Sequence, residues 1–295
     1  MNNKTVIFIG GPTASGKTRI AIDLAKKLKC EIISGDSRQF YKGMAIGTAQ
    51  PSAEELAEAP HHFIAFTEPN NEINAGQYEQ LALEKCNELF KTNDYVLCVG
   101  GSGLYLKALY EGFHAFPDIK EGTREKLIDE LDTLGIGHLQ KELQEKDPVR
   151  YEALDKNNPQ RLIRALEVIR STGKTYTSFV NIEPKQRDFD ILKFQPEMER
   201  SILYDRINQR VDLMYDMGLL KEVEVLKPYW NNNSLKTVGY SENISFFKGV
   251  LSIEEANELL KKNTRNFAKR QLTWFKKEDF KTVQSAEDIT SKLCL

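Results

Sequence analysis

The chain has 295 residues, of which 40% are hydrophobic and 28% charged, and its formal net charge at pH 7 is −2. This length and composition are typical of a globular protein with one large domain or two smaller ones, and they exclude a fibrous or disordered chain. The slightly negative charge indicates no general affinity for nucleic acid, so such a partner would have to bind at local basic patches.

The first apolar segment, Val6 to Ile9, is too short to span a membrane or to form the core of a signal peptide. We therefore expect a cytoplasmic protein without membrane contact. We also expect it to be a monomer. The four cysteines are widely separated and lack metal-binding spacing, which indicates reduced, structural residues. They are Cys30, Cys86, Cys98 and Cys294. The adjacent His61 and His62 would point in opposite directions in a strand or loop, so they too are interpreted as structural.

The first part of the chain alternates predicted strands with predicted helices. A β-branched strand at Thr5 to Ile9 is followed by a glycine loop and a helix at Arg19 to Leu28. A second strand at Glu31 to Ser34, a helix at Ala75 to Phe90 and a third strand at Tyr95 to Val99 follow. This order predicts an α/β fold with a P-loop NTPase-like parallel sheet flanked by helices, whose ligands bind at the carboxyl ends of the strands.

The middle of the chain is predicted to be entirely helical. Helices are expected at Thr123 to Leu134, at Gly137 to Gln144 and at Asn158 to Ser171, the last with Asn158 as its N-cap and Gly173 beyond its end. We interpret 122–181 as a helical insertion, and 1–121 together with 182–295 as the core.

After the insertion, a strand at Ile191 to Phe194 is expected to return to the sheet. Helices follow at Glu199 to Met217 and at Ser252 to Lys276, where Ser252 and Glu255 form a capping box. The second helix carries several basic side chains around Trp274 and Phe275, and such local basicity suits a track for phosphate groups. These side chains belong to Lys261, Lys262, Arg265, Lys269, Arg270, Lys276 and Lys277.

A phosphate-binding loop follows the first strand. The segment Gly11-Pro12-Thr13-Ala14-Ser15-Gly16-Lys17-Thr18 fits the pattern G-x-x-x-x-G-K-[ST] in every position and leads into a helix. Backbone N–H groups and the helix N-terminus would surround phosphate oxygens, Lys17 would add a positive charge, and the Thr18 hydroxyl would bind Mg²⁺. The pattern predicts a phosphorylated ligand but does not say which one.

Two features separate this chain from a common P-loop ATPase. The strand at Tyr95 to Val99 ends in Gly100-Gly101 where many P-loop NTPases have a magnesium-binding aspartate. The carboxylate at the end of the second strand, Asp36, is instead positioned to act as a base. Considered alone, a strand-end aspartate is more often a cap or turn residue than a base.

Several motifs in the same order resemble the tRNA dimethylallyltransferase (isopentenyltransferase) family over nearly the whole chain. They are the phosphate loop, Asp36-Ser37-Arg38-Gln39-Phe40-Tyr41, Gly43 to Ala49, Gly100-Gly101-Ser102-Gly103-Leu104-Tyr105, Asn158-Pro159-Gln160-Arg161, Arg164 to Val168, and Lys269-Arg270-Gln271-Leu272-Thr273-Trp274. The chain departs from the family at Ser102, which replaces a threonine, at Phe40, and at Ser241, which replaces a basic residue.

The resemblance implies that a dimethylallyl group passes from dimethylallyl pyrophosphate to N6 of the adenosine 3′-adjacent to the tRNA anticodon. It implies that Asp36 accepts the N6 proton, while residues 11–18, Mg²⁺ at Thr18 and Arg210 hold the pyrophosphate. The target base would be flipped out of the anticodon loop and read beside Asp36 by Ser37, Arg38 and Gln39.

Further tRNA contacts are implied at Ser102 and in the helical insertion, which would bind the anticodon stem-loop. The insertion residues are Arg124, Gln160, Arg161, Leu162, Ile163 and Arg164. The residues themselves leave two alternative functions open. One is a P-loop kinase of a small metabolite with Asp36 as base, and the other is a non-catalytic, nucleotide-dependent RNA-binding module.

Overall fold

The computed structural model describes residues 4–112, 118–180 and 185–293. The chain forms two compact units, one made of 1–111 with 186–295 and one made of 112–185. The insertion therefore begins earlier in the chain than the expected residue 122. The expected boundary at 181/182 lies outside the described residues, as does Cys294.

A parallel sheet of six strands organises the first unit, in the order β3-β2-β4-β1-β5-β6. The strands are β1 Thr5–Gly10, β2 Ile32–Ser34, β3 His61–His62, β4 Tyr95–Gly100, β5 Asp190–Pro196 and β6 Lys281–Val283. The register aligns Gly10 with Gly100 and Ser34 with Val99, so β1, β2 and β4 end at the same edge of the sheet. The predicted α/β class with a parallel sheet is confirmed.

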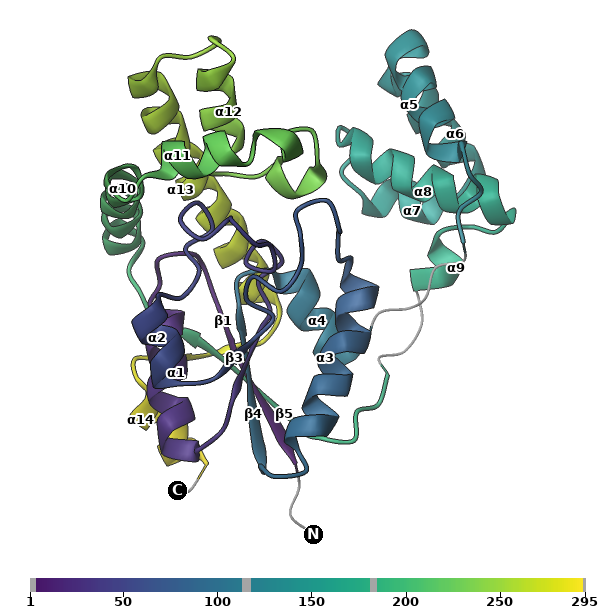
Figure 1. Ribbon diagram of the computed structural model, residues 1–295. Helices are drawn as coiled ribbons and strands as arrows, with labels where there is room; N and C mark the ends of the chain where they lie inside the picture. Colours follow the sequence, from purple (N-terminus) through teal and green to yellow (C-terminus); the bar gives the residue numbers. More distant parts are fainter. Residues whose placement is uncertain (1–3, 113–117, 181–184, 294–295) are drawn as a thin grey trace. The chain divides into compact units, whose positions relative to one another are not determined.

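Alternation along the strands divides the apolar side chains between two helical layers. Ile7 and Ile9 of β1 face α1 (Lys17–Leu28) and α14 (Ala286–Lys292). Val6 and Phe8 face α3 (Ala75–Leu89) and α4 (Gly103–Glu111). Figure 1 shows these two helix pairs on opposite sides of the sheet. Because both faces are covered, residues 6–9 are all fully buried, which explains a continuous apolar run instead of an alternating one.

The helices that follow β5 build a second apolar core within the same unit. They are α10 Arg200–Asp216, α11 Leu219–Val225, α12 Ser241–Phe247 and α13 Ile253–Lys277, with the short 3₁₀ turns Lys227–Tyr229 and Asn233–Leu235. Leu219, Leu235, Tyr240 and Leu260 are buried in this core together with Met44. The predicted capping box of α13 is present, since Ser252 and Glu255 exchange both hydrogen bonds.

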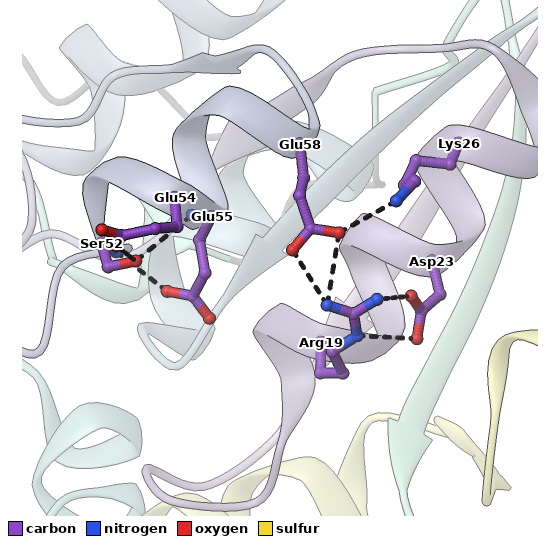
Figure 2. A network of polar contacts seen from close by, with 7 residues as sticks. All are labelled: Arg19, Asp23, Lys26, Ser52, Glu54, Glu55 and Glu58. Atoms are coloured by element: carbon purple, nitrogen blue, oxygen red, sulfur yellow. Dashed lines mark hydrogen bonds and ion pairs between the residues drawn. The ribbon is translucent and has the colours of Figure 1, made fainter.

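A short helix, α2 (Ala53–Glu58), is held to α1 by charge. None of the side chains in this described segment is buried. Figure 2 shows Glu58 paired with both Arg19 and Lys26, while Arg19 also binds Asp23. Since Arg19 directly follows Thr18, this ion-pair network attaches α2 to the helix that carries the phosphate loop.

The second unit is all-helical, as predicted. Its helices are α5 Thr123–Leu134, α6 Ile136–Lys146, α7 Pro148–Ala153, α8 Pro159–Thr172 and α9 Thr177–Val180. Asn158 caps α8 through the Arg161 N–H and Gly173 ends the helix with φ of 73°, which confirms both predicted termini. The amphipathic faces of α5, α6 and α8 enclose one apolar core.

Elements that the sequence did not reveal are short or irregular. The two-residue β3 and three-residue β6 are too brief to show a period, and α2, α7, α9, α11, α12 and α14 have seven residues or fewer. The nine-residue α4 was also not predicted. His61 and His62 each bind a neighbouring oxygen, that of Ala59 and that of Glu31. No helix in the described ranges is both long and apolar enough to cross a bilayer. Cys30, Cys86 and Cys98 are buried free thiols.

Candidate active site

A cavity of about 740 Å³ opens at the edge of the sheet where β1, β2 and β4 end. Its lining residues come from the loops after these strands, from the start of α4, from 236–238 and from α10, α12 and α13. The structure brings six of the residues predicted from the sequence to this cavity. They are Thr13, Asp36, Ser37, Arg38, Ser102 and Arg210.

Residues Gly11 to Thr18 form the connection from β1 into the first turn of α1. Ala14 has φ of 63°, in the left-handed region, so the loop turns tightly there. The Ser15 hydroxyl is buried and has no hydrogen-bond partner among the described residues. A buried hydroxyl without a partner is costly. The loop is therefore suited to a ligand that supplies hydrogen-bond acceptors.

Lys17 lies within this loop and donates a hydrogen bond to the Pro12 carbonyl at 2.6 Å. Burial lowers the pKa of Lys17 to about 8, against an opposing attraction from Asp36 and with a smaller repulsion from Arg210. An ammonium group that is difficult to keep charged without a ligand would be stabilised by an anion. These interactions also establish that Asp36 and Arg210 lie near the phosphate loop.

Asp36 follows β2 and is oriented by its own backbone turn. Its Oδ1 accepts a hydrogen bond from the Arg38 N–H at 3.1 Å. The preceding Gly35 donates its N–H to the Val99 carbonyl at 2.7 Å, and a Cβ at Gly100 would lie 2.3 Å from the Gly35 carbonyl carbon. Such close backbone contact requires glycine at residue 100. Strand β4 therefore ends in a glycine instead of an aspartate, and this glycine leaves room for the backbone that carries Asp36 after β2.

The residues after Asp36 bond to neighbouring loops. Ser37 donates its N–H to the Ser102 hydroxyl at 3.0 Å, and the two hydroxyls are 3.0 Å apart. The Arg38 guanidinium donates to the carbonyls of Asn233 and Ser234 at 3.1 and 3.3 Å. The Gln39 amide donates to the Ala49 carbonyl at 2.9 Å, and Gln39 does not line the cavity.

Arg210 projects from α10 toward the phosphate loop. Its Nη1 donates to the Thr13 hydroxyl at 3.5 Å. Burial lowers the pKa of Arg210, with a raising contribution from Glu55 of α2 and a lowering one from Arg206. A half-buried guanidinium beside this loop is suited to bind two oxygens of a phosphate group bidentately.

Two residues that shape the site were given no role by the sequence analysis, although Gln271 lies within one of the motifs that carry the resemblance. Gln271 bridges the phosphate loop and Gly101, and it sits on the buried face of α13 with Leu260, Ala268 and Phe275. A glutamine at a core position of an amphipathic helix was the available signal. Glu222 accepts hydrogen bonds from the N–H groups of residues 46 and 47 and from the Tyr240 hydroxyl, which fixes the loop along one cavity wall. No periodicity marks such a carboxylate.

The predicted tRNA-binding residues of the second unit fall into two groups. The side chains of Leu162 and Ile163 are 0% and 2% exposed in the helical core, so the expectation that they contact RNA is corrected for these side chains. Arg161 and Gln160 are exposed. Arg124 pairs with the buried Glu167 at 2.8 Å and donates to the Gln160 amide oxygen at 3.0 Å.

Arg164 pairs with the same Glu167 at 3.4 Å. Elsewhere in the second unit, Glu130, His138 and Glu142 form a group with metal-ligand spacing among the described residues. The Arg170 guanidinium already bonds to both carboxylates of that group, so the negative charge of the group is compensated. This group is a structural ion-pair cluster.

A parallel sheet, a complete phosphate-binding loop and an adjoining cavity that contains a carboxylate and a half-buried arginine define an enzyme of the P-loop fold that acts on a phosphorylated substrate. Residues 39–278 match the family model described as IPP transferase. The chain belongs to the IPP transferase family and is therefore an enzyme that transfers a prenyl group. The matched segment begins after the phosphate loop and Asp36, so the features of this loop and of Asp36 are observations independent of the family match.

Individual relatives agree with this assignment. The tRNA dimethylallyltransferase of Flavobacterium psychrophilum is 49% identical over 280 residues, which cover 93% of this chain and 91% of the relative. That of Flavobacterium johnsoniae is 47% identical over 282 residues, with 94% and 91% covered.

Solved structures are similar as well. The tRNA isopentenylpyrophosphate transferase of Bacillus halodurans has a TM-score of 0.69 and 36% identity, covering 95% of this chain and 89% of that chain. A eukaryotic dimethylallyltransferase acting on tRNA has a TM-score of 0.80 and 26% identity, covering 97% and 75%.

Proposed function

We propose that this enzyme transfers the dimethylallyl group from dimethylallyl pyrophosphate to N6 of the adenosine 3′-adjacent to the anticodon of a tRNA. The products are N6-(dimethylallyl)adenosine and pyrophosphate. The observation that carries the proposal is that one cavity joins Thr13 and Arg210, at the phosphate loop, to Asp36. The group that leaves and the group that attacks therefore have separate, adjoining binding regions.

In the proposed reaction, the N6 lone pair forms a bond to C1 of the dimethylallyl group while the bond from C1 to the pyrophosphate oxygen breaks. The electrons of that bond leave with the pyrophosphate, and Asp36 accepts the proton from N6. The Asp36 Oδ1 is already bonded to the Arg38 N–H, which fixes the orientation of the carboxylate. Its negative charge also stabilises positive charge that develops on the allylic carbon.

The phosphate loop supports the departure of pyrophosphate. Lys17 and Arg210 provide positive charge, and the buried Ser15 hydroxyl, which has no partner within the described chain, can donate to a phosphate oxygen. One preorganised charge or donor of this kind contributes about 3 kcal/mol to stabilisation of a transition state. This interaction grows as the bond breaks, so it favours the transition state over the bound substrate.

Magnesium fits the donor set of this loop. Mg²⁺ keeps several waters and binds through a few protein oxygens together with substrate phosphates. Thr18 at the start of α1 would supply a hydroxyl, and no carboxylate ends β4, so oxygens of the pyrophosphate and water would supply the rest. When bound, the ion neutralises charge on the leaving group.

An adenine stacked in an anticodon loop cannot reach a cavity of this kind, so the proposal requires base flipping. The walls formed by Ser37 and Ser102 adjoin Asp36 and present polar groups for the edge of the base. The helical insertion supplies the exposed cationic side chain of Arg161 for the anticodon stem-loop. We propose that the enzyme acts in the cytoplasm as a monomer, because the phosphate loop, Arg210 and Asp36, which carry both halves of the proposed reaction, belong to one chain and the reaction needs no second copy.

The test is mass spectrometry of an unmodified tRNA after incubation with the purified enzyme, Mg²⁺ and dimethylallyl pyrophosphate. The expected result is a mass increase of one dimethylallyl group on the adenosine 3′-adjacent to the anticodon, together with release of pyrophosphate. A parallel reaction with ATP and small hydroxyl compounds tests the alternative of a P-loop kinase. Phosphoryl transfer in that reaction without any prenylation of tRNA would overturn the proposal.

A further inference from the structure

Gln271 of α13 lines the cavity and joins two segments that are distant in the sequence. Its Oε1 accepts a hydrogen bond from the Thr13 N–H at 2.9 Å, and its Nε2 donates to the Gly101 carbonyl at 2.9 Å. The residue is 5% exposed. The side chain is therefore a buried bridge between the phosphate loop and the loop after β4.

Only a side chain with both a donor and an acceptor can make this bridge. Thr13 offers an N–H and Gly101 offers a carbonyl oxygen, so the amide of Gln271 satisfies both. A carboxylate lacks the donor for Gly101, and a hydrocarbon lacks both groups. Glycine at residue 101 is part of the arrangement, since a Cβ there would lie 2.3 Å from Nε2 of Gln271.

The two bridged segments carry the two halves of the proposed chemistry. On one side, the Thr13 hydroxyl contacts Arg210. On the other side, a Cβ at Gly101 would lie 3.5 Å from Oδ2 of Asp36, so this loop borders the carboxylate directly. The next residue of that loop, Ser102, accepts the hydrogen bond from the backbone that follows Asp36.

We infer that Gln271 is a positioning residue that sets the separation between the pyrophosphate-binding loop and Asp36. The inference rests on the proposed function, because it concerns the geometry in which N6, C1 and the leaving oxygen must align. A displacement of about 1 Å from that geometry can reduce a rate by about 100-fold. Gln271 acts through Thr13 and Gly101.

The experiment measures single-turnover prenyl transfer and thermal unfolding for the full-length parent, Gln271→Met and Gln271→Glu. Met has a similar length and removes both hydrogen bonds, whereas Glu keeps the acceptor for Thr13 and loses the donor for Gly101. We expect the rate at saturation to fall about 10- to 100-fold. The KM for dimethylallyl pyrophosphate should change less than about threefold, because Lys17 and Arg210 remain.

Gln195→Met is the matched control. Gln195 is a partly buried glutamine of β5 that donates to one backbone carbonyl, that of Phe280, at 3.1 Å. It does not line the cavity. This variant should keep the parent rate, and a loss as large as that of Gln271→Met would show that any buried glutamine has the same effect and would overturn the inference.

A double-mutant cycle with Asp36→Asn separates positioning from general destabilisation. If Gln271 acts by placing Asp36, its substitution should cost no more than about threefold once the carboxylate has been removed. The inference would be overturned if the rate loss of the double variant equalled the product of the losses of the two single variants. A parent-like rate for folded Gln271→Met would overturn it as well. Should Gln271→Met not fold, the same cycle with Gln271→Glu decides. An inactive parent enzyme would instead overturn the proposed function.

Discussion

The two groups of residues that the family resemblance assigns to tRNA are built differently. In the first unit, Ser37, Arg38 and Gln39 are bonded to neighbouring loops, and they form part of the structure that holds Asp36 in place. In the second unit, Arg124 and Arg164 share the buried Glu167. Resemblance identifies a surface, whereas the structure distinguishes the side chains that shape it from those presented outward.

The largest expected effect removes the charge that the first group positions. We expect Asp36→Asn to lower kcat by about 10²- to 10⁴-fold, because general-base assistance is lost while the amide oxygen can still accept a hydrogen bond from N6. Affinities for both substrates and the Tm should stay close to those of the parent. Single-turnover transfer by folded Asp36→Asn at the parent rate would remove Asp36 from its proposed role.

The next largest effect is on the affinity for pyrophosphate, and it concerns Lys17 of the phosphate loop. The pKa of Lys17 is lowered to about 8, so the ammonium loses its proton as the pH rises through this value in the unliganded enzyme. Pyrophosphate binds the protonated form more tightly, so its affinity should fall from pH 7 to pH 9, and binding near pH 8.5 should take up a proton.

Calorimetry in buffers of different ionisation enthalpy measures that proton uptake. Lys17→Met is the control that cancels the titration of pyrophosphate itself, and it should lose about 10-fold or more in affinity at pH 7, the magnitude of one charge-assisted hydrogen bond. Equal proton uptake by parent and variant would assign the titration to another group.

A smaller effect tests the second group. The exposed Arg161 should contact a phosphate, so Arg161→Ala should weaken tRNA binding severalfold and reduce the slope of log K against log salt by about 0.7 to 0.9. Its Tm should not change, since the side chain packs against no core. Filter-binding titrations over a range of salt concentrations measure the slope.

Arg164→Ala provides the contrast within the same helix. Glu167 would keep Arg124 as its partner but lose the ion pair with Arg164, so this variant should lower the Tm as well as the affinity. If Arg161→Ala left the salt slope unchanged, Arg161 would be an ordinary solvated side chain. An unchanged Tm in Arg164→Ala would show that its pair with Glu167 contributes no measurable stability.

The smallest effect returns to the first group. Arg38 donates to two carbonyls of the 3₁₀ turn at Asn233–Leu235. We expect Arg38→Ala to lower the free energy of unfolding by about 1 to 3 kcal/mol and to reduce transfer severalfold. Arg38→Lys should recover part of the loss, because both bonds come from the single Nη1 nitrogen and an ammonium can also donate to two carbonyls. A normal Tm together with lost tRNA binding would instead make Arg38 a direct contact.

Local signals were sufficient for much of the fold and for part of the site. The phosphate loop is recognisable because its motif depends on residues close in sequence, and helix ends such as Asn158 and Ser252 follow capping rules. The roles of Asp36 and Arg210 came from the family resemblance. Gln271 and its partner Thr13 are 258 residues apart, so only the folded chain brings them together.

Burial explains the remaining differences. Leu162 and Ile163 lie inside a motif implied to bind RNA, yet the helical period turns them to the core between exposed Arg161 and half-buried Arg164. Arg124 of α5 forms an ion pair with Glu167 of α8. A sequence motif gives the residue types of a surface, but it does not show which of their side chains are buried in the core.

The chain order of the sheet also affects how the protein is made. The central strand β1 pairs with β4 and β5, and β5 lies beyond the entire helical insertion. On the ribosome, the edge of β1 that β5 later covers stays unpaired after β4 has emerged, until the whole insertion has been synthesised. The helix with Gln271 emerges later still, so the nascent active site is completed only after β5, and the exposed strand edge is meanwhile open to wrong pairing.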